Sequence, residues 1–286
     1  MKTIIVPIDF SDHSIKGLEL ALVFAKVMKA NIDMVYVQKK TGEYFPNIKD
    51  QQLKWAEKKF KEIQKEYACG MPKRNKLDFI IKHGKVYQEI INQAHSYKDS
   101  IIVTSTHGIS GWDDIFLGSN ATKIIAHTTK TVITFNNGEV PFSINKILLP
   151  LDHSVDTRQK VPATIELAKV FKAEIIVAPV ISSKNDEKKA KIQSYADQVC
   201  KRLTKEKIQH KTKMLCGKSL SETIVKYAET AKVDIISIMS EQNPGITSLL
   251  LGNHAEIILT QSKVPVMITT PKDIFLASES FRTQGS

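Results

Sequence analysis

Short apolar runs alternate with longer amphipathic stretches along the first half of the chain. Residues 4–8, 32–37, 77–81, 101–104 and 131–135 form five runs that are rich in isoleucine and valine. Runs of this length and composition are typical of buried strands. The pattern therefore predicts five strands in this half.

The stretches between these runs have the period of a helix. Ser11 is the expected N-cap of the first helix, and the fourth is expected to begin at Ser119. Apolar residues recur at spacings of three and four, which places them on one helical face. This face holds Ile15, Leu18, Leu22, Ala25 and Met28 on the first helix, Leu53, Ala56, Phe60, Ile63 and Tyr67 on the second, Val86, Ile90, Ile91 and Ala94 on the third, and Ala121, Ile124 and Ile125 on the fourth.

Strands that alternate with helices are joined by right-handed crossovers, which put helices on both faces of a parallel sheet. We therefore predict an α/β fold of the Rossmann-like kind. Each unit is expected to be an open, mostly parallel five-stranded sheet with helices on both faces.

The second half of the chain repeats the first. Residues 2–11 and 146–154 each contain an apolar run that ends in Pro-apolar-Asp-x-Ser, so that Asp9 corresponds to Asp152. The repeat predicts two domains, residues 1–143 and 144–275, followed by a tail of residues 276–286. Later landmarks match as well: His83-Gly84-Lys85 with Cys216-Gly217-Lys218, Asp99 with Asp234, and Gly118 with Gly252.

Each half ends its sheet with an apolar run, residues 131–135 in the first and 264–269 in the second. An exposed strand of this kind is adhesive, because its backbone groups lack partners along one edge. We therefore expect the two halves to pair through these strands as a pseudo-twofold dimer within one chain. Whether whole chains also form homo-oligomers stays open.

Composition and charge exclude several classes of protein. Hydrophobic residues make up 42% and charged residues 25% of the chain, as in ordinary globular proteins, and no apolar run approaches the roughly 18 residues of a membrane span. Cys69, Cys200 and Cys216 show no CxxC spacing, which favours a reducing cytoplasm over a disulfide framework or a zinc site. The net charge of +11 comes mainly from lysines scattered along helices, since only four of the 41 basic residues are arginine. We interpret this charge as a solvated surface rather than a nucleic-acid-binding face.

Candidate chemistry lies at the carboxyl ends of two strands, where ligands bind in open parallel sheets. Residues 7–11 follow the first strand and include Asp9, and residues 104–108 follow the fourth. Gly118 then leads into a helix whose first-turn N–H groups attract anions. Structural roles stay open: Asp9 or Ser11 could cap the first helix, Gly118 could simply open a turn with Ser119 as the N-cap, and His107 could be an ordinary loop residue.

These segments resemble the universal stress protein family. Its nucleotide-binding members carry Gly-x2-Gly-x9-Gly-Ser/Thr after the fourth strand and an aspartate after the first. Here the motif reads Ser105-x2-Gly108-x9-Gly118-Ser119, so it departs only at the first glycine. A serine there weakens the case for binding without closing it.

The resemblance implies a site for ATP or a related AMP or ADP, and a magnesium or manganese ion could accompany the phosphates. Asp9 would contact the ribose or adenine side, and the backbone around Val37 would receive the adenine. Gly108, Gly118, Ser119 and the N–H of Asn120 would hold the phosphates. The full set of implied cofactor-binding residues is Pro7, Ile8, Asp9, Val37, Thr104, Ser105, His107, Gly108, Gly118, Ser119 and Asn120.

The second half departs much further from the motif. Met239 and Gln242 stand where the first two glycines would fall, and Asn253 replaces the hydroxyl residue, so only Asp152 and Gly252 are retained. Bulky side chains would intrude on a phosphate. The resemblance therefore implies one nucleotide per chain, in the first half.

No catalytic apparatus stands out, so we expect a binding module with little or no hydrolysis and predict neither a catalytic residue nor a metal site. Gly217-Lys218-Ser219 is not a P-loop, because Thr212 occupies the position of the required first glycine. Two alternatives stay open: a partner-docking protein with two vestigial pockets, and an enzyme of the adenine-nucleotide alpha hydrolase-like group.

Overall fold

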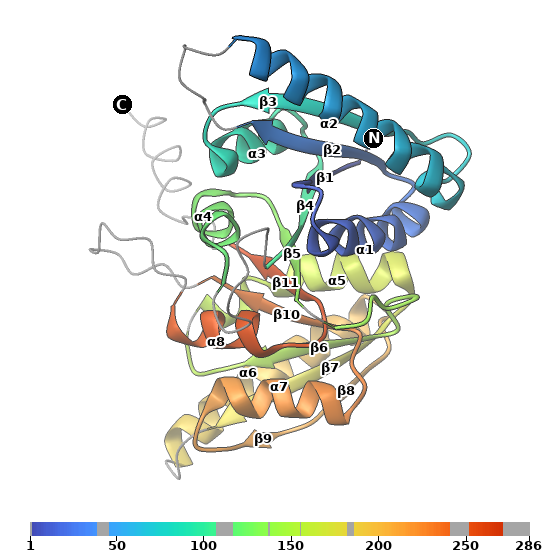
Figure 1. Ribbon diagram of the computed structural model, residues 1–286. Coiled ribbons are helices and arrows are strands. Elements are labelled where there is room, and N and C mark those ends of the chain that lie inside the picture. The colour runs from blue at the N-terminus through green and yellow to red at the C-terminus, as the bar shows by residue number, and fades with distance from the viewer. Residues whose placement is uncertain are drawn as a thin grey trace, which may run out of the picture.

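The structure is a computed structural model that describes residues 2–38, 46–106, 117–136, 138–154, 156–181, 186–240 and 252–270. Strands alternate with helices in both halves of the chain, which confirms the predicted α/β fold (Figure 1). The first half contains β1 (Thr3–Pro7), α1 (Asp12–Met28), β2 (Asn31–Gln38), α2 (Pro46–Tyr67), β3 (Leu77–His83), α3 (Val86–His95), β4 (Ser100–Ser105), α4 (Ser119–His127) and β5 (Val132–Phe135). The second half contains β6 (Lys146–Leu151), α5 (Val161–Phe171), β7 (Glu174–Ile181), α6 (Asp186–Lys205), β8 (His210–Thr212), β9 (Leu215–Cys216), α7 (Leu220–Thr230), β10 (Ile235–Met239), α8 (Asn253–Gln261) and β11 (Val266–Thr269).

The two halves share one strand topology. The first half has the order β3-β2-β1-β4-β5 with every pairing parallel, and the second has the matching order β8-β7-β6-β10-β11. In the second half the short strands β8 and β9, which both pair with β7, stand in place of β3. In the first half the chain moves outward from β1 through β2 to β3 and then returns to β4 on the other side of β1, and the second half repeats this order around β6. Ligands in such folds bind at this switch point, between β1 and β4 or between β6 and β10.

The predicted pairing of the two last strands is confirmed. β5 and β11 run antiparallel, with Ile133 opposite Met267, so the two halves form one 11-stranded sheet. This pairing covers the edge of each half that would otherwise be exposed.

The core forms one layer on each face of this sheet. Buried side chains of α1, α2, α5 and α6 belong to one layer, and those of α3, α4, α7 and α8 to the other. Phe24 of α1 meets Phe171 of α5 edge to face, with ring centroids 5.2 Å apart, and the two helices lie side by side in Figure 1. Each core layer is therefore continuous across both halves.

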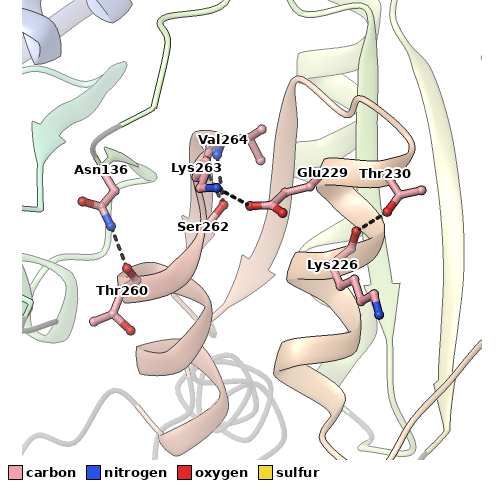
Figure 2. Close-up of polar contacts among 8 residues, drawn as sticks. All are labelled: Asn136, Lys226, Glu229, Thr230, Thr260, Ser262, Lys263 and Val264. Atoms are coloured by element: carbon pink, nitrogen blue, oxygen red, sulfur yellow. Dashed lines mark hydrogen bonds and ion pairs between the residues drawn. The ribbon is translucent and has the colours of Figure 1, made fainter. Parts of the chain in front are cut away.

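Polar contacts also join the halves. Figure 2 shows Asn136, just after β5, donating through Nδ2 to the carbonyl oxygen of Thr260 in α8 at 2.7 Å. The ion pair drawn in the same view, between Lys263 Nζ and Glu229 Oε1 of α7 at 3.6 Å, lies within the second half. A Cβ atom on Gly138 would collide with the backbone of Lys263, so this close approach of the two segments requires glycine.

The sheet corrects one detail of the repeat. β1 pairs Ile4 with Ile101, whereas β6 pairs the corresponding Ile147 with Ile235. The register therefore matches Ile101 to Ile235, and the predicted match of Asp99 with Asp234 is wrong by one residue. The match of Gly118 with Gly252 agrees with this register, because both residues immediately precede equivalent helices.

Candidate functional site

Asp9 follows β1 and is held by the start of α1. Its Oδ1 accepts hydrogen bonds from Ser11 N at 3.1 Å and from Ser11 Oγ at 2.5 Å. Ser11 is the N-cap of α1, as predicted, because its Oγ accepts from Ser14 N at 3.3 Å. Ser11 therefore caps α1, and its hydrogen bonds to Asp9 fix the position of the Asp9 carboxylate at the carboxyl end of β1.

Phe10 has an unusual backbone conformation that the sequence pattern did not predict. Its φ is 65°, in the left-handed region that residues other than glycine rarely adopt. The ring packs against Tyr36, Trp55 and Phe60, with centroids about 5 Å from each. We infer that this packing compensates for the backbone strain and sets the turn that carries Asp9.

A groove of 850 Å³ opens beside this turn, between the N-terminus of α1 and α2. Asp9, Phe10 and Trp55 are among its lining residues. Burial, followed by the negative charge of Asp9, raises the pKa of Tyr36, which packs against the same turn.

The end of β2 holds Val37, whose side chain is buried in the core. Gln38, the next residue, is 3% exposed, and neither polar atom of its side-chain amide has a hydrogen-bond partner in the described part of the chain. Its carbonyl oxygen accepts from Gly84 N at 3.2 Å. Buried amides normally have partners, so Gln38 leaves a donor and an acceptor available to a bound molecule. The sequence analysis did not identify this residue.

The end of β4 is joined to the start of α4. Thr106 N donates to Phe135 O at 2.9 Å, and Gly118 N donates to Thr106 O at 2.7 Å. These bonds place the N-terminus of α4 directly beyond Thr104 and Ser105. His107 and Gly108, which the resemblance includes in the site, lie outside the described residues.

Within the described residues, the N-terminus of α4 has no side-chain cap. Gly118 is the N-cap residue, with φ of −56°, and α4 begins at Ser119 as predicted, so the alternative that Ser119 is the N-cap is wrong by one position. Ser119 and Asn120 are exposed. A helix start that lacks a capping side chain leaves backbone N–H groups for an anion, where the helix dipole also favours negative charge.

The sheet brings these pieces to a single edge. β2, β1 and β4 are adjacent and parallel, so their carboxyl ends lie next to one another. Pro7, Asp9, Val37, Ser105 and Gly118 therefore lie along one side of the first domain. The described residues contain no group of histidine, cysteine and carboxylate side chains suited to a metal ion.

The matching edge of the second domain is built differently. Asp152 Oδ1 accepts from Ser154 N at 2.7 Å, but α5 begins only at Val161, and a short 3-10 helix, Asp156–Arg158, stands in place of the first turns of α1. Gly252 has φ of 78°, unlike Gly118, and thus needs glycine for its backbone conformation alone. Gln242 lies outside the described residues.

Fold and repeat together define a class of protein in which two doubly wound α/β domains share one sheet. The chain belongs to the universal stress protein family, whose model matches residues 1–136 and 143–270. None of the helices in the described ranges has the length and apolar character needed to cross a membrane.

Known relatives match one domain or both. The chain is 30% identical to universal stress protein YxiE of Bacillus subtilis over 142 residues, which are 45% of this chain and 95% of that protein. It is 26% identical over 137 residues to a universal stress protein of Thermus aquaticus, covering 46% of this chain and 96% of that protein. The crystal structure of a universal stress protein from Archaeoglobus fulgidus is similar over 94% of this chain and 98% of its own, with a TM-score of 0.76 and 21% identity. This last likeness supports the two-domain fold.

Proposed function

We propose that the first domain binds an adenine nucleotide, either ATP or the related AMP or ADP, at the edge formed by β2, β1 and β4. The observation that carries this proposal is the joining of the uncapped N-terminus of α4 to the end of β4, next to the fixed carboxylate of Asp9. An anion-attracting helix start beside a hydroxyl-binding carboxylate matches the phosphate and ribose of a nucleotide.

Each part of the nucleotide has a proposed contact. Adenine lies against the backbone at Val37, where the unpartnered amide of Gln38 adds a donor and an acceptor. Asp9 accepts from the ribose hydroxyls, and the first turn of α4 holds the phosphates through Gly118, Ser119 and Asn120. Pro7, Ile8, Thr104, Ser105, His107 and Gly108 complete the proposed lining, and a magnesium or manganese ion would bind through the phosphates.

Hydrolysis is expected to be slow or absent. Fast phosphoryl transfer needs cationic groups at the developing charge and a residue that orients water. Arg74, the only arginine before residue 143, precedes β3. It therefore lies at the amino ends of the parallel strands, whereas the site lies at their carboxyl ends. The proposed role is thus a nucleotide-binding regulator of the cytoplasmic stress response, with turnover far below one per second.

Titration calorimetry with ATP tests the proposal. The expected stoichiometry is one per chain, and Gly118→Val should weaken binding at least about 100-fold, because two lost phosphate contacts at roughly 1.5 kcal/mol each correspond to that factor. Valine tolerates the φ of −56° at this position, so the variant should fold. The matched control is Asn253→Ala at the equivalent helix start of the second domain, which should leave the affinity unchanged.

Ser105→Gly restores the glycine of the family motif and should tighten binding. Loss of binding in Asn253→Ala but not in Gly118→Val would show that the nucleotide site lies in the second domain and that the proposal is wrong. Absence of binding by the unmodified chain, together with no nucleotide released from purified protein in mass spectrometry, would favour the alternative of a docking protein with two vestigial pockets.

A further inference from the structure

A buried lysine distinguishes the second domain from the first. Lys160 is the N-cap residue of α5 and is only 5% exposed. The C-cap residues of α1 and α5 are Lys29 and Lys172, which both adopt the left-handed conformation. They lie 143 positions apart in the sequence, as do the corresponding residues Asp9 and Asp152. Counted back from these residues, Lys160 occupies the position of Gly17. The second domain has therefore gained a buried positive charge where the first has no side chain.

The ammonium group lies at the carboxyl end of β6. Lys160 Nζ donates to Thr157 Oγ1 at 3.2 Å, and the same oxygen accepts from Asp152 N at 3.2 Å. An ammonium group has three donors, and this is its one hydrogen bond within the described ranges. The Asp152 carboxylate is bonded to Ser154 and acts on Lys160 through longer-range attraction. Two donors of a buried cation therefore stay available.

Two further polar groups at the same edge lack partners. Ser240 Oγ and Thr269 Oγ1 are buried without a hydrogen bond in the described part of the chain. Ser240 follows β10, the neighbour of β6, and Ser240 N donates to Thr269 O at 3.1 Å. The equivalent Thr106 of the first domain bonds Phe135 O through its hydroxyl. At this position, therefore, the hydroxyl without a partner in the described part of the chain belongs to the second domain.

We propose that the second domain binds a small oxyanion on Lys160, at the N-terminus of α5 and the carboxyl ends of β6 and β10. A buried cation with unfilled donors gains both charge neutralisation and hydrogen bonds from an anion, and the α5 dipole adds to the attraction. Met239 stands in the register position of Ser105, so its bulk restricts the site to a ligand smaller than a nucleotide. Ser240 Oγ supplies a further donor.

The charge state of Lys160 suits this role. Burial, opposed by the attraction of Asp152, lowers the pKa of Lys160 to about 8, so the amine is still mostly protonated at pH 7. Asp152 follows β6 and has His153 beside it, while β10 and β11 carry no ionisable side chain. On α5 itself, Glu166 and Lys169 lie more than one turn further along. Binding should therefore weaken as the pH rises above 8.

Residue-resolved ¹⁵N NMR with inorganic phosphate as the probe, in chloride-poor amine buffer, tests the site. In the unmodified chain at pH 7, the amide signals of Val161, Ala163 and Thr164 should shift saturably, and the apparent affinity should fall at least tenfold at pH 9.5. Lys160→Met should abolish these shifts, and Ser240→Ala should reduce the affinity severalfold. The matched control Lys169→Met removes an equal charge from the exposed side of α5 and should keep the response.

Shifts that persist in Lys160→Met, or that vanish equally in Lys169→Met, would show that phosphate binds only through the surface charge, which would overturn the proposal. No shift of Val161, Ala163 or Thr164 in the unmodified chain would overturn it as well. Signals at the start of α4 report on the first domain, so this result and the test of nucleotide binding fail or succeed independently.

Discussion

Replacing Lys160 by methionine should stabilise the protein, by an amount that depends on pH. Lys160 as a whole is 5% exposed, and its ammonium group makes one hydrogen bond within the described residues. Methionine keeps most of the buried aliphatic chain but removes this group. Replacing a buried charge by an apolar group of similar volume is often stabilising. The variant is therefore expected to fold and to resist urea better than the unmodified chain at neutral pH.

The size of the effect follows from the pKa of Lys160. Burial lowers this pKa from its ordinary value of 10.5 to about 8, and each unit corresponds to 1.36 kcal/mol between the two protonation states. Between pH 8 and 10.5 the unfolded chain binds more protons than the folded chain, so the free energy of unfolding of the unmodified protein rises with pH. Burial of the charged form of Lys160 therefore destabilises the folded protein in full below pH 8, and this destabilisation disappears above pH 10.5. The advantage of Lys160→Met should therefore shrink by about 3 kcal/mol over this window.

Urea denaturation of both proteins between pH 6 and 10.5, in amine buffers free of oxyanions, measures this difference. The difference between the two proteins is informative because tyrosines whose pKa is raised in the folded state make the stability of both proteins depend on pH in the same way near the top of the window. Lys169→Met, which removes a charge from the exposed side of the same helix, should differ from the unmodified chain by an amount that stays constant. A constant difference for Lys160→Met as well would refute the reasoning, because the buried ammonium would then carry no cost.

Three further predictions concern the first domain and its contact with the second. Asp33→Asn should bring the pKa of Tyr97 down from about 12, since the Tyr97 hydroxyl donates to the Asp33 carboxylate at 2.7 Å; absorbance titration at the phenolate band, with Tyr97→Phe as the blank, measures it. Phe10→Ala should be less stable than Phe10→Gly by about 1 kcal/mol in urea denaturation, because φ is 65° and only glycine adopts this conformation without strain; equal stabilities would contradict that strain. A double-mutant cycle of Phe24→Ala and Phe171→Ala should give a coupling of about 0.5–1.5 kcal/mol in the free energy of unfolding, and additive effects would mean that these edge-to-face rings do not join the domains.

Much of the fold could be read from local pattern. Buried strands are short and apolar, and helices repeat their apolar residues every three or four positions, so the alternation of elements, the duplication and the adhesive last strands are all visible along the chain. The same holds for Asp9 and Gly118, because their place at strand ends follows from the element order. These inferences need only a residue and its near neighbours in sequence.

Other features depend on contacts between distant segments, which no local pattern encodes. The left-handed turn at Phe10 exists because Tyr36, Trp55 and Phe60 surround its ring, and those side chains come from β2 and α2. The amide of Gln38 is buried without a partner only through the packing around the end of β2. Lys160 looks like one of many surface lysines in the sequence. Only the packing of α5 against the sheet removes it from water, and desolvation then gives it a different chemistry from the other lysines of the same helix.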